Sequence, residues 1–129
     1  MPRSLYDPNQ PPEPRSWLAL DEAERIRQVE VFHRKARIRL PTARGHAALH
    51  VIVENQIALG SETPAAATLA RLTRQGLSRH DALHAIATVL AEHLNALQRG
   101  EFTSDRDPND AYYAALAELT PESWRRRFT

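Results

Sequence analysis

Hydrophobic positions recur along most of the chain with the spacing of helices. Residues 47–59 are apolar at most positions and around most of the helix surface that they would form, and residues 82–94 have a similar composition. A helix that is apolar nearly all round is normally buried on several sides. Alternation of apolar and polar residues with enrichment in β-branched side chains, the pattern of strands, is absent. The sequence therefore predicts an all-α fold.

Capping residues, prolines and glycines mark where these helices begin and end. Asp21 with Glu24, and Ser78 with Asp81, have the spacing of a capping box. The signals predict four main helices at about residues 21–35, 42–59, 64–75 and 79–99. They also predict two short C-terminal helices, after Asp107-Pro108 and after Thr120-Pro121.

Five prolines within residues 1–16 predict an extended, proline-rich N-terminal arm that lies over the domain. Residues 17–129 are then expected to form one helical bundle domain. Short connections make sequential helices antiparallel neighbours, so the expected architecture is an up-down bundle of the four main helices.

Composition narrows the function classes. The chain has 129 residues, the size of one domain, and a net charge of +1, which gives no basic field for nucleic acid. It has no cysteine, so a metal could be held only by imidazole and carboxylate. No apolar run reaches the roughly 18 residues of a membrane span, and the start has no signal-peptide core. A cytoplasmic protein is the default expectation.

Two histidine pairs are the most informative chemical feature. His46 and His50 lie four residues apart in one predicted helix, and His80 and His84 in another. Residues four apart share a helix face, so each pair can approach one metal ion from one side. In an up-down bundle both pairs lie near the N-terminal ends of their helices, at the same end of the bundle. His33 lies there too, near the C-terminal end of the first helix. The sequence predicts that these five histidines form one layer, in which His46, His50, His80 and His84 bind metal and His33 is either a further ligand or a core histidine. The alternative is a hydrogen-bonded histidine cluster.

Carboxylates near this layer have several possible roles. Glu54 is either a metal ligand or a carboxylate that orients His50. Glu30, three residues before His33, is a further possible ligand. Asp81 is interpreted chiefly as a helix cap, and Glu54 or Asp81 is the candidate general base. His93 lies away from the layer and is expected to be structural or exposed.

The expected ligand set suits one or two divalent transition-metal ions, with zinc or iron favoured. Three histidines with an open fourth position would activate water for hydrolysis. Five histidines with carboxylates could instead hold two ions for oxygen or redox chemistry. The sequence thus predicts a small metalloenzyme acting on a small molecule. The alternative is a non-catalytic metal sensor, storage protein or protein-interaction module, and a homodimer is conceivable.

Three segments resemble a family of short bacterial proteins defined as a domain of unknown function. The first runs from Tyr6-Asp7-Pro8 through Trp17 to Glu22. The second comprises residues 46–56, and the third comprises residues 79–86. The resemblance covers roughly residues 6–99. It implies a small, histidine-rich helical protein and carries no assigned activity.

Overall fold

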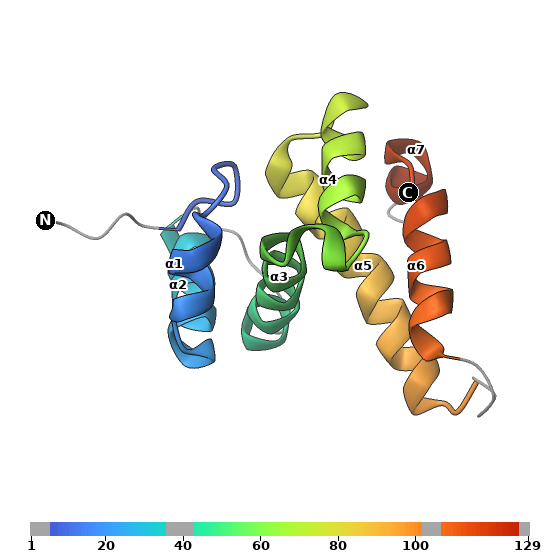
Figure 1. Ribbon diagram of the computed structural model, residues 1–129, viewed down its shortest axis with the longest axis horizontal. Helices are drawn as coiled ribbons and strands as arrows, with labels where there is room; N and C mark the ends of the chain where they lie inside the picture. The colour runs from blue at the N-terminus through green and yellow to red at the C-terminus, as the bar shows by residue number, and fades with distance from the viewer. Residues whose placement is uncertain (1–5, 36–42, 102–106, 127–129) are drawn as a thin grey trace, which may run out of the picture.

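The computed structural model describes residues 6–35, 43–101 and 107–126, and the regular secondary structure in these ranges is helical, without strands (Figure 1). The side chains of residues 32–35 and 43–46 lie outside the described part. The helices are α1 (Pro14–Ala19), α2 (Glu22–Lys35), α3 (Ala43–Ala58), the short 3-10 helix η1 (Gly60–Glu62), α4 (Ala65–Arg74), α5 (Arg79–Gln98), α6 (Pro108–Glu118) and α7 (Pro121–Arg126). The all-α prediction is confirmed.

Capping interactions place the helix ends close to where the sequence predicts them. The Asp21 carboxylate accepts a hydrogen bond from the Glu24 amide, at 2.8 Å, at the start of α2. The Ser78 hydroxyl accepts from the Asp81 amide, at 3.1 Å, at the start of α5. Such bonds satisfy amides that have no partner within the first helical turn.

The N-terminal segment differs from the extended arm predicted for residues 1–16. Residues 6–12 are non-helical, but α1 begins at Pro14. The Glu13 carboxylate accepts from the amides of Arg15 and Ser16 and caps this helix. The prediction was wrong for residues 14–16 because proline is favoured at the first helical position, where its missing N–H costs nothing. Residues 1–5 lie outside the described residues.

Helix α3 contacts α1, α2, α4 and α5 and has hydrophobic clusters on two sides. Val53 belongs to the larger cluster, which is built with α4, α5 and α6. Ala47 and Val51 belong to a smaller one, with Tyr6, Trp17 and Val29. This arrangement explains why α3 is apolar nearly all round.

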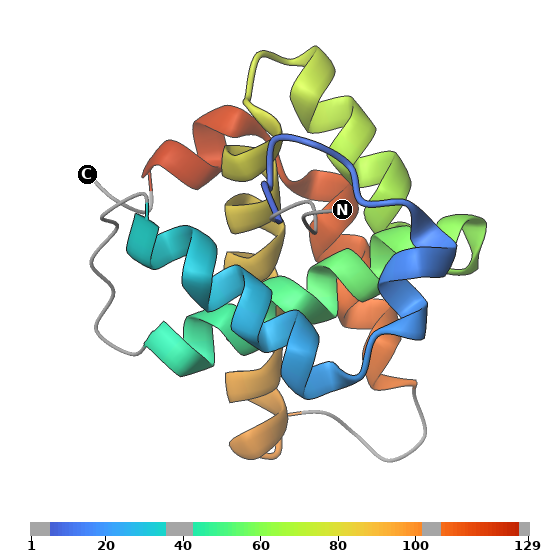
Figure 2. The same cartoon turned by 90° about the vertical axis from the view of Figure 1, so that its left-hand side faces the viewer.

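The helices do not share one axis. In Figure 2, α2 crosses in front of α3, whereas α5 runs steeply behind both. The predicted up-down four-helix bundle is therefore not confirmed. Helix α5 nevertheless packs against α3, and polar residues near the start of α5 meet those of α3 there.

Candidate metal centre

Two polar residues of α3 are buried. His50 and Glu54, one helical turn apart, are each about 1% exposed. Both ordinarily remain near water, because an isolated buried charge or imidazole is costly. Their burial therefore requires polar partners from other segments.

The start of α5 supplies several of these partners. The cap at Ser78 starts the helix at Arg79, so His80 lies in the first turn and His84 one turn further on. Both histidines are half-buried, and the four-residue spacing puts them on one face.

Three histidines from the two helices converge. Ligand nitrogens of His50, His80 and His84 all lie within 4.8 Å of one another. The His50 ring centroid is 5.9 Å from that of His80 and 5.6 Å from that of His84, and those of His80 and His84 are 4.2 Å apart. Nitrogens that each bind zinc at about 2.1 Å are at most about 4.2 Å apart. The three imidazoles are thus close to the separation that one ion requires.

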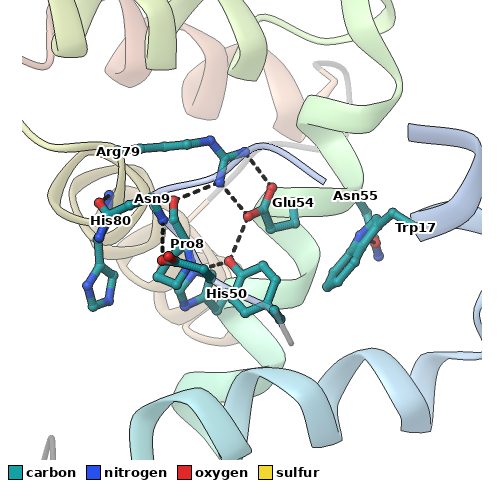
Figure 3. Close-up of polar contacts among 10 residues, drawn as sticks. Pro8, Asn9, Trp17, His50, Glu54, Asn55, Arg79 and His80 are labelled. Carbon is teal, nitrogen blue, oxygen red and sulfur yellow. Dashed lines mark hydrogen bonds and ion pairs between the residues drawn. The ribbon is translucent and has the colours of Figure 1, made fainter. Parts of the chain in front are cut away.

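A buried ion pair lies beside this triad. The Arg79 guanidinium donates to both carboxylate oxygens of Glu54, from Nη1 to Oε2 at 2.7 Å and from Nη2 to Oε1 at 2.8 Å (Figure 3). Burial lowers the pKa of Arg79, but the hydrogen bond and charge of Glu54 outweigh it and raise the pKa overall. Arg79 therefore stays cationic and holds Glu54 from α5.

Tyr6 joins this ion pair to the histidines. Its hydroxyl donates to Glu54 Oε2 at 2.6 Å and lies 2.8 Å from His50 Nε2. Burial, followed by the negative charge of Glu54, raises the pKa of Tyr6 far above its ordinary value. The side chain thus stays a neutral phenol and keeps its proton for a hydrogen bond.

The rest of the N-terminal segment also contacts the start of α5. The Arg79 guanidinium donates to the Pro8 carbonyl at 2.9 Å, and the His80 amide donates to Asn9 Oδ1 at 3.1 Å (Figure 3). An Asx turn, in which the Asp7 carboxylate accepts from the Asn9 amide, shapes this segment. Residues 6–9 are therefore hydrogen-bonded to the first turn of α5, which contains His80.

The structure brings together three of the predicted ligands and places the others differently. Glu54, Glu30 and Asp81 lie outside the triad among the residues described. Glu54 contacts His50 through Tyr6, which favours the role of an orienting carboxylate. Glu30 is half-buried on α2, and Asp81 is exposed in the first turn of α5.

The remaining histidines fall into two groups. The side chains of His33 and His46 lie outside the described residues, so their predicted role as ligands stays a prediction. His93 is 8% exposed, and its ring stacks on Tyr112 with centroids 5.4 Å apart. This position matches the structural role expected for it.

Sequence reasoning missed Tyr6 and Arg79. One usable signal existed: a glutamate in a helix that is apolar all round needs a cation if it is buried. That signal does not say which of the chain's 17 basic residues pairs with Glu54. Tyr6 lies in a non-helical segment, where no periodicity indicates what a side chain faces.

Comparisons with protein-family models, with curated protein sequences and with solved structures give no significant match for this chain. The resemblance to a bacterial family of unknown function therefore stays a prediction. Among the described residues, the helices are too short or too polar for any of them to cross a membrane.

Proposed function

We propose that this chain is a metal-binding protein in which His50, His80 and His84 hold one divalent transition-metal ion, zinc or iron, between α3 and α5. The observation that carries the proposal is the convergence of three imidazoles from two helices. Imidazole nitrogen suits zinc, iron, copper and nickel, and histidine is the commonest metal ligand in proteins.

The triad also supports a hydrolytic metalloenzyme. Three protein ligands leave a fourth position for water, and a bound zinc ion lowers the pKa of that water to about 7. His80 and His84 are only half-buried, so part of each side chain is accessible to solvent. We propose a small-molecule substrate, and a cytoplasmic location and a homodimer stay predictions.

One observation favours the non-catalytic alternative, a metal sensor or storage protein. Both candidate general bases lie outside the triad: Glu54 is bound to Arg79, and Asp81 is exposed at the cap of α5. Hydrolysis of an activated ester by the zinc-loaded protein, compared with the metal-free protein, separates the two. Equal rates would favour the sensor or storage role.

Metal binding is tested by elemental analysis of the purified protein and by titration with Zn²⁺ and Fe²⁺. We expect about one equivalent of metal per chain. His50→Gln, His80→Gln and His84→Gln should each weaken binding by about 100-fold or more, because each removes a ligand. His93→Gln is the matched control and should bind as the wild type does. Less than about one tenth of an equivalent, with no thermal shift on adding metal, would remove the proposal.

The same titration assigns His33 and His46. If either completes the site, its change to glutamine weakens binding as the triad variants do. Wild-type affinity in both variants would limit the protein ligands to the triad.

A further inference from the structure

We propose that Tyr6 is a positioning residue of this centre: its hydroxyl holds His50 in the tautomer protonated at Nε2, so that Nδ1 is the nitrogen that binds metal. The consequence for metal rests on the proposed function. The tautomer itself is a property of the metal-free protein and can be measured separately.

Counting protons at Tyr6 gives the direction of each hydrogen bond. A tyrosine hydroxyl has one proton, and an ionised carboxylate can only accept. Glu54 is bound through both oxygens by Arg79 and lies 2.6 Å from the hydroxyl, so the Tyr6 proton goes to Glu54. The Tyr6 oxygen is then the acceptor for the ring nitrogen 2.8 Å away, and His50 Nε2 must donate.

The same count at His50 identifies the ligand atom. A neutral imidazole has one N–H, and the hydrogen bond made by one nitrogen decides which nitrogen can bind a metal. With the proton on Nε2, the lone pair is on Nδ1. The Nδ1 atom of His50 is buried, as is the Nε2 atom of His80 in the same triad.

The chain Arg79–Glu54–Tyr6–His50 resembles the carboxylate–histidine–metal arrangement, with a phenol inserted between carboxylate and imidazole. Its members come from the N-terminal segment, α3 and α5. Residues 6–9 are therefore part of the proposed metal centre and not a peripheral arm.

The tautomer is measured first, in the metal-free wild-type protein. Long-range ¹H–¹⁵N spectra of protein labelled with ¹⁵N-histidine distinguish a protonated from an unprotonated ring nitrogen. We expect the proton of neutral His50 on Nε2. A proton on Nδ1 would overturn the inference, whether or not the protein binds metal.

The contribution of the Tyr6 hydroxyl to the tautomer and to metal affinity is measured with Tyr6→Phe. This variant keeps the ring, whose centroid lies 5.4 Å from that of Trp17. We expect loss of the single tautomer at His50 and about 10-fold to 100-fold weaker Zn²⁺ binding. With ¹¹³Cd²⁺ bound to the wild type, the metal–nitrogen coupling should appear at Nδ1 of His50.

Tyr112→Phe is the matched control. Tyr112 is also a buried tyrosine, and its hydroxyl also donates to α3, to Gln56 Oε1 at 2.8 Å, but it stacks on His93 and is not part of the triad. This variant should keep the His50 tautomer and the Zn²⁺ affinity.

The outcomes separate this inference from the proposed function. Wild-type protein that binds no metal defeats the proposed function, and the tautomer spectrum still decides the role of Tyr6. Metal binding with the same affinity and tautomer in Tyr6→Phe defeats the inference and leaves the metal site intact.

Discussion

At the scale of single residues, the most consequential interaction is the ion pair between Glu54 and Arg79. Their side chains are 1% and 10% exposed, and two parallel N–H···O bonds join them. Bringing both charges out of water is costly, so the pair is not a large net source of stability. Removing one partner alone lowers stability much more than replacing the whole pair, because the other charge is then left buried without a partner.

We therefore expect Arg79→Met to lower the free energy of unfolding by about 3–5 kcal/mol. Urea denaturation at neutral pH measures this change. The double variant with Glu54→Gln should recover part of the loss, since no buried charge remains.

Arg27→Met is the control for this prediction. Arg27 pairs with Glu24 at 2.6 Å but is 59% exposed, so solvent screens the pair and its loss should cost far less stability than the loss of Arg79. Equal losses in Arg79→Met and Arg27→Met would contradict the interpretation of a buried pair.

At the scale of elements, the first turn of α5 determines where three residues of the site lie. The cap at Ser78 fixes the start of the helix, and Arg79, His80 and His84 follow from that start. The N-terminal segment contacts the same turn through Pro8 and Asn9. Fraying of this turn would move the proposed ligand His80 and the cation Arg79 at once.

Ser78→Ala should lower stability by about 1 kcal/mol through the lost cap and should also weaken Zn²⁺ binding. Asp107→Ala is the matched control, because the Asp107 carboxylate caps α6 by accepting from the Asn109 amide at 2.9 Å. It should cost similar stability and leave the affinity unchanged. Equal affinities in the two variants would show that the cap does not position the triad.

At the scale of the whole molecule, α3 is held from both sides by tyrosines from distant parts of the chain. Tyr6 donates to Glu54, and Tyr112 donates to Gln56. Burial raises the pKa of Tyr112 to about 12, although the hydrogen bond with Gln56 lowers it. Ionisation of this tyrosine is thus linked to unfolding.

The sign of this linkage follows from a native pKa above the unfolded value of about 10. The contribution of the neutral Tyr112 side chain to the free energy of unfolding is fully present below pH 10. It is lost as the pH rises toward 12, by up to about 2 kcal/mol. Denaturant curves recorded across this range should show a smaller decline in stability for Tyr112→Phe than for the wild type. Parallel declines would contradict the linkage.

The local features of the fold could be predicted from the sequence because they depend on neighbours in the chain. Capping bonds such as that of Ser78 join residues three apart, and the apolar positions of α3 follow helical periodicity. The exception was α1, where the density of prolines obscured Pro14 as a helix start. The position of His80 and His84 on one face of α5 could be predicted for the same reason, because it follows from their four-residue spacing.

Only the tertiary structure decided which of these residues meet. The sequence alone determined the all-α class, the helix ends and the faces that carry the histidines. It predicted that His50 meets His80 and His84, but only through an up-down bundle that the structure does not confirm. It did not indicate that Glu54 is held by Arg79 and Tyr6. These contacts join positions 25 to 48 residues apart, and they depend on how α5 crosses α3 and where the non-helical residues 6–9 lie. Periodicity records the neighbours within a helix, whereas long-range partners are set by packing.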